Sequence, residues 1–293
     1  MALNIATFKT RAATAGVFVA VMLAGLLWNH WSFFILFSVI HFGCWIEYQK
    51  LVRLIDPGYN SISPFHQYGV MLAGWCILLF FTNDAFSIFD IQLSAIGWWL
   101  GLIAVFVLPI MELLFSKNLE LKNIAHSAFG LLYISLSLGL MMDLRCFGMK
   151  GNMEPVNFNF AAFALPLGIF IALWINDTMA YLVGSFIGRT PFSKISPKKT
   201  WEGTAGGAIL CIAVVALLGW WAKVYTVKDW IAIAAIVAVL GVIGDLFESK
   251  LKRLAGVKDS GSIMPGHGGF LDRFDSLLLA TPFVWLYVVI FMK

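Results

Sequence analysis

Charged residues are scarce in this sequence. Only 12% of its 293 residues are Asp, Glu, Lys or Arg, whereas 60% are hydrophobic. Soluble globular domains carry about twice that share of charge, on the order of 25%, so the composition excludes a water-soluble domain and makes lipid the expected solvent. The net charge of +4 does not indicate a nucleic-acid partner, because in such a chain the informative feature is which loops carry the basic residues.

Other features are missing as well. The cysteines Cys44, Cys76, Cys146 and Cys211 form no CxxC pair and show no metal-ligand spacing, so we expect them to be small core residues. There is no tandem repeat, no low-complexity tract and no linker long enough to separate soluble domains. No Walker phosphate-binding motif is present either. A single membrane unit is therefore expected.

Long apolar runs dominate the sequence instead. Nine have spanning or near-spanning length, centred on residues 12–28, 31–46, 68–82, 91–115, 123–142, 159–182, 204–221, 229–248 and 275–292. Such runs must be helical in a bilayer, because an unpaired backbone amide in hydrocarbon costs several kcal/mol. The expected fold is an all-α, polytopic integral membrane protein with about nine transmembrane helices.

The basic residues predict the orientation of these helices. With a cytoplasmic N-terminus, all but five of the 20 Lys and Arg residues fall in inside segments; the exceptions are Arg145, Lys150, Lys223, Lys228 and Lys293. Because cytoplasmic loops carry the excess of Lys and Arg, we expect a protein of the cytoplasmic membrane with its N-terminus inside and its C-terminus outside.

The two halves differ in polar content. Residues 1–157 are expected to form scaffold helices, with dimerisation as a candidate role; their isolated polar residues show no chemical constellation. Segment 47–67 carries a turn signal and is expected to be an amphipathic or irregular cytoplasmic stretch that lies at the interface. Residues 158–293 are expected to be the catalytic transmembrane region, with cytoplasmic loops at 188–203 and 249–274. About a third of the residues from Asp245 to Asp275 are charged, so chemistry is expected there.

One polar constellation closes the eighth apolar run. At helical spacing Asp245, Ser249 and Lys252 share a face, with Glu248 and Arg253 beside them. A carboxylate, a hydroxyl and cations at a membrane surface suit Mg²⁺ and phosphate. The alternative is an interfacial helix end with snorkelling cations.

A second constellation leads into the last helix, from residue 258 to residue 275. Its glycines allow positive φ angles and let backbone amides approach an anion. Asp272 and Asp275 lie three apart at the helix start, where simple capping is the alternative. The charged members and the histidine are Lys258, Asp259, His267, Asp272, Arg273 and Asp275.

A third constellation lies upstream. Asn176 and Asp177 interrupt an apolar run, so we expect them to face the protein interior. Lys198 and Lys199, followed by Thr200 and Glu202, suit a polyphosphate, although two lysines near a membrane could also meet anionic head groups.

Together these stretches resemble the phosphatidate cytidylyltransferase (CDP-diacylglycerol synthase) family. The resemblance is firm over residues 174–275 and includes Asn176-Asp177, Tyr181 and the stretch SPKKTWEG. The family signature expects these residues at these spacings: Ser249, Lys252, Arg253, Lys258, Asp259, His267, Gly268, Gly269, Asp272, Arg273 and Asp275.

The resemblance implies transfer of a cytidylyl group from CTP to phosphatidate, with Mg²⁺ bound by Asp245 and Asp272 and a homodimer as the assembly. Apart from the two metal ligands, the catalytic candidates are Lys252, Arg253, Lys258, Asp259 and His267. The substrate-binding candidates are Asn176, Asp177, Lys198, Lys199, Thr200, Glu202, Ser249, Arg273 and Asp275.

Three alternatives remain open from the residues. Another CTP-dependent lipid enzyme would act on a prenyl-ether phosphate or phosphorylate a polyprenol. A secondary transporter would place its charges near the bilayer midplane, whereas here most gather at one face. A purely structural membrane protein has no use for so dense a polar cluster.

Overall fold

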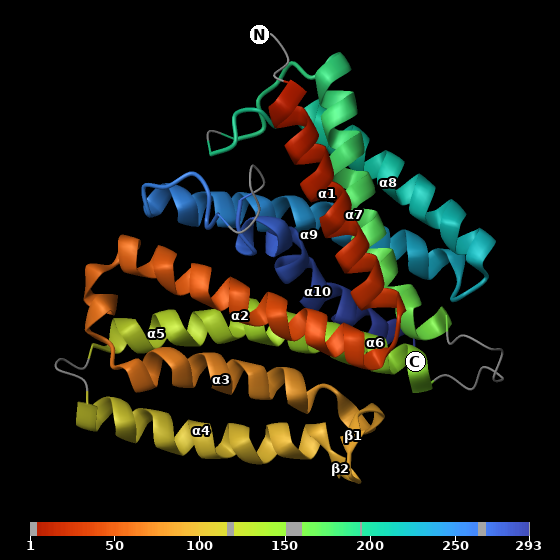
Figure 1. Ribbon diagram of the computed structural model, residues 1–293. Coiled ribbons are helices and arrows are strands. Elements are labelled where there is room, and N and C mark those ends of the chain that lie inside the picture. Colours follow the sequence, from red (N-terminus) through yellow and green to blue (C-terminus); the bar gives the residue numbers. More distant parts are fainter. Residues whose placement is uncertain (1–4, 116–119, 151–159, 194, 263–267, 293) are drawn as a thin grey trace. The chain divides into compact units, whose positions relative to one another are not determined.

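The computed structural model describes residues 5–115, 120–150, 160–193, 195–262 and 268–292, and these are helical almost throughout (Figure 1). Seven helices are long and apolar enough to cross a membrane, and two shorter apolar helices, Thr14–Leu27 and Pro64–Phe80, accompany them. Each corresponds to one of the predicted runs. The prediction of an all-α polytopic membrane protein with about nine helices is confirmed.

The chain divides into two units, each of which is described by itself. Unit 1 consists of Met1–Gly139 and Leu254–Phe274, and unit 2 of Leu140–Arg253 and Asp275–Lys293. The predicted boundary at residue 157 between a scaffold and a catalytic region stays a prediction.

Unit 1 begins with two helices that break at Asn29. The Asn29 side chain accepts a hydrogen bond from the backbone N–H of Ser32, and the Ser32 hydroxyl reaches back to the N–H of Asn29, a capping box that starts a new helix here. These two helices are the first of the elements, which in chain order are α1 (Ile5–Leu27), α2 (His30–Ile55), η1 (Pro57–Ser61), α3 (Pro64–Phe80), η2 (Asn83–Ala85), β1 (Ser87–Ile88), β2 (Ile91–Gln92), α4 (Leu93–Phe115), α5 (Leu121–Gly130) and the π-helical turn η3 (Leu131–Leu136).

Of the two alternatives expected for 47–67, an irregular stretch is largely wrong, whereas an amphipathic stretch at the interface stays a prediction. Residues 47–55 belong to α2, and only the turn at Asp56 and the short helix η1 interrupt the helices. The Asp56 carboxylate accepts a hydrogen bond from the N–H of Gly58, as the turn signal predicts. Glu47 is therefore held on a regular helix.

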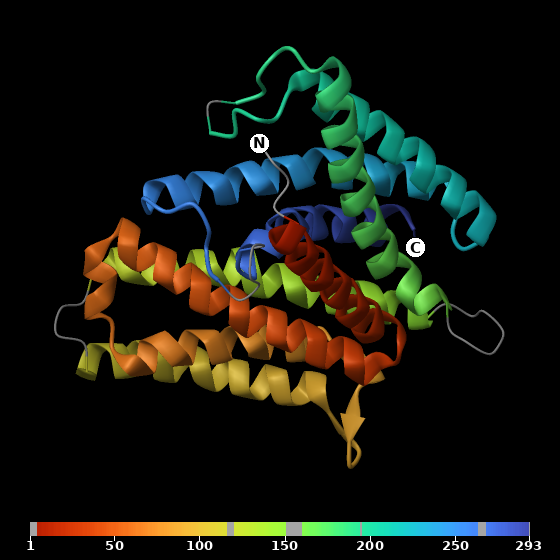
Figure 2. The same cartoon turned by 45° about the horizontal axis from the view of Figure 1, so that its top comes forward.

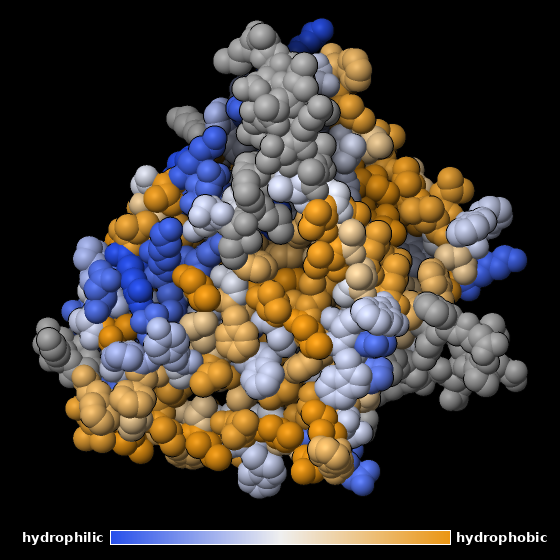
Figure 3. Space-filling view, viewed as in Figure 1, coloured by the Kyte–Doolittle hydropathy of each residue, from blue (hydrophilic) through white to orange (hydrophobic). Residues whose placement is uncertain are grey.

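Helices α2, α3, α4 and α5 run alongside one another within unit 1 (Figures 1 and 2). Gly97 lets α4 approach α3 closely, since a Cβ there would lie 2.5 Å from the backbone nitrogen of Phe80. The antiparallel pair β1–β2 connects these two helices by way of η2 (Figure 2). The side of α4 that faces away from α3 is apolar and exposed, and part of it is visible as orange surface in Figure 3.

Unit 2 contains most of α6 (Ser137–Lys150), then α7 (Phe160–Ile187), α8 (Trp201–Ala222), most of α9 (Val227–Leu254) and all but the first turn of α10 (Leu271–Phe291). Small residues set its packing. A Cβ on Gly207 would lie 2.7 Å from the backbone nitrogen of Ala180, so α8 and α7 touch backbone to backbone. A Cβ on Gly244 would lie 2.6 Å from the carbonyl oxygen of Asp275, which places the start of α10 directly against α9.

Candidate active site

The predicted α9 cluster meets three other segments of unit 2 around Asp245 and Asp275. Its carboxylate forms an ion pair with the ammonium of Lys199, and both side chains are about three-tenths exposed. The Asp275 carboxyl, from α10, lies within hydrogen-bonding range of Asp245, and Asp177 of α7 is close enough to interact with it electrostatically. Residues from three of the predicted constellations therefore converge here.

This convergence is chemically unusual because Asp275 is only 7% exposed. Two carboxyl groups in contact away from water repel each other unless they share a proton or face a cation. Lys199 supplies one positive charge to the pair. The close contact at Gly244 fixes the spacing, since it brings the Asp275 backbone against α9.

The loop that delivers Lys199 is built locally. Glu202 accepts hydrogen bonds from the N–H groups of Arg189 and Thr190 and from the Thr190 hydroxyl, at 2.8–3.2 Å. The Thr200 hydroxyl caps α8 by accepting from the N–H of Gly203 at 3.1 Å. Both residues thus shape the loop, whose described cations include Lys198, an exposed side chain, and Lys199.

Asn176 and Asp177 of α7 differ in burial. Asn176 is buried at 1% exposure, as predicted for a residue that faces the interior, whereas Asp177 is exposed within unit 2. The expectation that both are buried is wrong for Asp177, because successive helical residues point about 100° apart. Asp177 instead belongs to the carboxylate group around Asp275.

Lys252 pairs with Glu248 one turn earlier on α9. Glu248 is fully buried, and the Lys252 side chain is only 12% exposed. A buried carboxylate needs such a partner. Ser249 is half-buried, and Arg253 is exposed at the end of the same helix segment.

The signature loop before α10 belongs to unit 1, where Glu47 organises it. Both carboxylate oxygens of this α2 residue accept backbone hydrogen bonds: Oε1 from the N–H of Phe270 at 2.9 Å and Oε2 from that of Leu271 at 2.8 Å. These N–H groups are among those that a helix start leaves without an intrahelical acceptor, and a negative charge there also complements the helix dipole. Glu47 therefore caps α10 from a distant part of the chain.

Asp272 is held in the same cluster. Its Oδ2 atom accepts hydrogen bonds from the N–H of Ser260 at 2.9 Å and from that of Gly269 at 2.8 Å. The Ser260 hydroxyl lies 2.9 Å from this atom and 2.7 Å from Oε2 of Glu47, so it shares its one proton between two carboxylates. One oxygen of Asp272 is thus committed to shaping the loop.

The glycines of the loop make room for these carboxylates. A Cβ on Gly261 or Gly269 would lie 2.1–2.2 Å from the Glu47 oxygens, and Gly268 has φ +80° with a Cβ position 2.5 Å from Oδ2 of Asp272. The predicted positive φ is confirmed at Gly268. The anions that the loop amides contact here are the protein's own side chains.

The other signature residues are placed as follows. Lys258, Asp259 and Arg273 are exposed in unit 1. His267 lies outside the residues that the structure describes. Asp245 and Asp272 belong to different units, so their predicted shared metal stays a prediction.

Sequence reasoning missed Glu47 and treated the polar residues of the first half as unconnected. A weak signal was present, because Glu47 directly follows the apolar run 31–46, and a carboxylate at the end of a membrane-spanning run can mark a functional site. Its partner loop lies more than two hundred residues later in the chain. No spacing rule connects positions so far apart.

Among the described residues, no group of three or more His, Cys, Asp or Glu side chains is arranged to hold a metal ion by itself. Mg²⁺ is commonly bound through one or two carboxylates, with substrate phosphates and water completing its shell. Asp245 and Asp275 supply two such carboxylates, and a cation that faces both would relieve their mutual repulsion. The donor set therefore fits Mg²⁺.

Comparisons with known proteins agree with this chemistry. A sequence profile described as "Cytidylyltransferase family" matches residues 9–291. A protein of Haemophilus influenzae named phosphatidate cytidylyltransferase is 32% identical, over 94% of this chain and 96% of that protein. A protein of the same name from Staphylococcus saprophyticus is 30% identical over 96% of this chain and 99% of its own length. Phosphatidate cytidylyltransferase 5, chloroplastic, of Arabidopsis thaliana is 30% identical over 96% of this chain and 72% of that protein.

Proposed function

Because this chain belongs to the cytidylyltransferase family, we propose that it transfers the cytidylyl group of CTP to phosphatidate, releasing pyrophosphate and leaving CDP-diacylglycerol in the bilayer. The family makes the chain a CTP-dependent nucleotidyltransferase. The names of its relatives support phosphatidate as the acceptor. The observation that carries the proposal is the meeting of Lys199 and Asp275 at Asp245 inside a membrane-embedded helical unit.

The acceptor needs no strong general base. A phosphomonoester has a second pKa of about 6, so the phosphatidate phosphate is already mostly dianionic at neutral pH. The difficulty is repulsion between this dianion and the triphosphate, together with the charge that develops on the departing pyrophosphate. Cationic side chains that bind both substrates reduce the repulsion and neutralise the developing charge. Because no base is needed, His267 is not assigned as one.

We assign the CTP phosphates to Lys198 and Lys199 of the Glu202-bound loop, of which Lys199 pairs with Asp245. The exposed side chains of Arg253, Lys258 and Arg273 are suited to the lipid phosphate. Lys252, paired with buried Glu248, contributes positive charge from a fixed position. Asp259 orients these cations. In-line attack of the lipid phosphate oxygen on the α-phosphorus then requires only alignment and charge neutralisation.

Mg²⁺ is the proposed cofactor. Asp245 would hold it, with Asp272 as the ligand that the family resemblance adds and Asp275 as the ligand that the contact with Asp245 adds. When bound, the ion neutralises phosphate charge and stabilises the leaving pyrophosphate. The chain's own part is to hold the carboxyl groups of Asp245 and Asp275 close enough for one cation to face both.

The proposed location is the cytoplasmic face of the cytoplasmic membrane, in a homodimer, with the N-terminus inside and the C-terminus outside. Diacylglycerol chains lose about 0.8 kcal/mol per methylene on leaving the bilayer, whereas CTP cannot enter it. The reaction therefore belongs at the interface that carries the excess of Lys and Arg.

A direct assay tests the proposal. Purified protein is given CTP, phosphatidate and Mg²⁺, and both CDP-diacylglycerol and pyrophosphate are measured with and without EDTA. We expect equal amounts of the two products and none after chelation. Release of CDP instead of pyrophosphate would identify a lipid kinase. Turnover with a prenyl-ether phosphate but not with phosphatidate would change the acceptor.

A further inference from the structure

A second polar site lies in unit 1, at the end of an apolar cavity that the proposed reaction does not use. The cavity is formed by α3, α4 and α5 with η3, and it measures about 480 Å³. Its walls are mainly aliphatic, with Val70, Ala73, Ala104, Leu108 and Leu131 among the lining residues. This volume lies within the range of about 300–1,000 Å³ of small-molecule sites.

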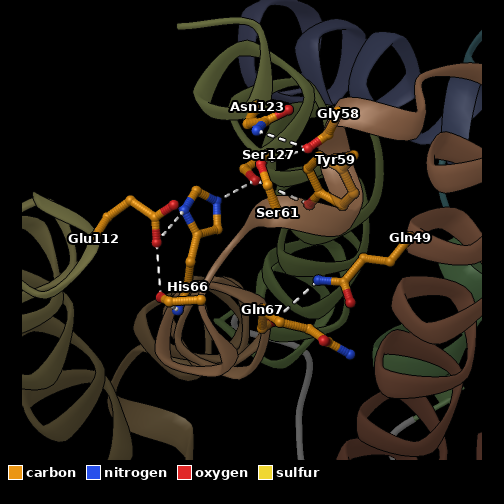
Figure 4. A network of polar contacts seen from close by, with 10 residues as sticks. Gln49, Gly58, Tyr59, Ser61, His66, Gln67, Glu112, Asn123 and Ser127 are labelled. Carbon is orange, nitrogen blue, oxygen red and sulfur yellow. Dashed lines mark hydrogen bonds and ion pairs between the residues drawn. The ribbon is translucent and has the colours of Figure 1, made fainter. Parts of the chain in front are cut away.

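Three polar side chains, each at least nine-tenths buried, also line the cavity: His66 at 9%, Glu112 at 4% and Ser127 at 4% exposure. Figure 4 shows the His66 ring between the other two. Its Nδ1 lies 3.3 Å from Oε2 of Glu112, and its Nε2 lies 2.6 Å from Oγ of Ser127. The ring therefore links a carboxylate to a hydroxyl.

Two more groups fix the direction of the hydrogen bonds. The Ser63 hydroxyl donates to Oε2 of Glu112 at 2.7 Å, and the Tyr59 hydroxyl lies 3.0 Å from Oγ of Ser127. With Glu112 ionised, His66 donates through Nδ1 and accepts from Ser127 through Nε2, while Tyr59 donates to Ser127. Every proton in the network thus points toward Glu112.

The network leaves acceptors at the cavity. No described residue donates a hydrogen bond to Oε1 of Glu112, and Glu112 lines the cavity, so this oxygen is available to accept a hydrogen bond from a ligand there. Pro109, another lining residue, has no N–H, so the carbonyl of Val105 lacks its usual helical donor. A ligand that fits must therefore bring a hydrogen-bond donor.

The lining also excludes classes of ligand. No Lys or Arg is among the described residues that line the cavity, so a phosphate or a fatty-acid carboxylate would meet Glu112 without a compensating cation. Val105 and Leu113 are 67% and 68% exposed, so the cavity opens on the apolar outer face of α4. A ligand can enter there from the bilayer.

We propose that this cavity binds a neutral single-chain lipid whose terminal hydroxyl donates a hydrogen bond to Glu112. A long-chain alcohol and a monoacylglycerol share this chemistry. The chain occupies the aliphatic walls, and the His66–Ser127 pair holds the carboxylate in place. None of the described lining residues is among those assigned to cytidylyl transfer.

Photolabelling tests the proposal. The full-length protein in phosphatidylcholine nanodiscs is exposed to hexadecanol carrying a chain diazirine and an alkyne tag, and the labelled peptides are identified by mass spectrometry. We expect saturable labelling of α3, α4 and α5 and at least about tenfold weaker labelling by the methyl ether of the same probe, which lacks the donor. Competition with unlabelled hexadecanol and with monopalmitoylglycerol distinguishes the two lipid sources.

Two variants complete the test. Ala104→Phe fills the cavity and should abolish the labelling, whereas Ile103→Phe adds the same ring next to it, at an exposed position outside the lining. Glu112→Gln should remove most of the preference for the alcohol over its ether. Equal labelling by alcohol and ether, better competition by lysophosphatidate, unchanged labelling of Ala104→Phe, or no labelling at all would each overturn the proposal.

Discussion

Glu47 links two distant parts of unit 1 through a single carboxylate. It accepts from the first N–H groups of α10 and from the Ser260 hydroxyl, and it occupies the space that Gly261 and Gly269 leave open. Asp272 completes the same cluster through Ser260 and Gly269. The shape of the signature loop therefore depends on a residue that lies outside the signature.

We predict that Glu47→Gln lowers turnover at least about tenfold and destabilises the protein by about 1–3 kcal/mol, because the amide NH₂ group must face backbone donors that now lack an acceptor. Thermal unfolding in nanodiscs and the CDP-diacylglycerol assay measure the two effects. Glu120→Gln, at an exposed carboxylate of the same unit, is the matched control and should behave like the wild type. Wild-type turnover of Glu47→Gln would refute the capping role.

A second residue-scale prediction concerns Asp275. Replacing it with Asn removes one of two apposed carboxyl groups, so the metal-free protein should become more stable while the stabilisation by Mg²⁺ shrinks. The measurement is the thermal midpoint in EDTA and in Mg²⁺ for both proteins. An unchanged Mg²⁺-induced shift would remove Asp275 from the metal site.

At this scale the sequence predicts residue types better than partners. Asp177 and Asp245 are visible as breaks in apolar runs, the lysines as a basic pair between two runs, and the Thr200 cap follows from local rules. The ion pair of Lys199 with Asp245 and the reach of Glu47 to α10 depend on tertiary packing. No local pattern encodes them.

Helices were the most predictable elements, because length and hydropathy decide what can cross a bilayer. The break at Asn29 and the turn at Asp56 also follow from side chains that compete for backbone donors. The π-helical turn η3 was not predictable, since nothing in its apolar sequence distinguishes it from an α-helix. It lies beside the cavity, where such irregularities often mark function.

At the scale of elements, we expect the contact between α9 and α10 to be the most sensitive to an added side chain. Gly244→Ala places a Cβ 2.6 Å from the carbonyl oxygen of Asp275, a backbone atom that can yield only if α10 shifts. We expect overpacking to cost about 1–3 kcal/mol and activity to fall with it, because Asp245 is adjacent.

Gly101→Ala provides the control for that substitution. It lies in α4, and its Cβ would meet only Cys76, at 3.7 Å. Alanine there should be neutral or stabilise the protein by about 0.5–1 kcal/mol through helix propensity. Equal thermal midpoints of the two variants would contradict a tight contact at Gly244.

For the whole molecule, the arrangement of basic residues predicts a cytoplasmic N-terminus. All four native cysteines are buried, so the background for labelling is low. Cysteines introduced at exposed Lys50 and Lys223 should differ: in intact cells, a membrane-impermeant maleimide should react with Lys223→Cys and not with Lys50→Cys. The reverse pattern would invert the topology and move the proposed site to the other face.

The capping of α10 by Glu47 has a consequence for evolution and for engineering. The second half of the chain cannot carry its signature loop into a new scaffold, because the acceptor for the N–H groups of that loop is encoded in the first half. Chimeras between relatives should be active only when the protein that supplies the loop also supplies a glutamate at the matching position of the second helix. Inheritance of the two segments is therefore coupled, although they stand far apart in the gene.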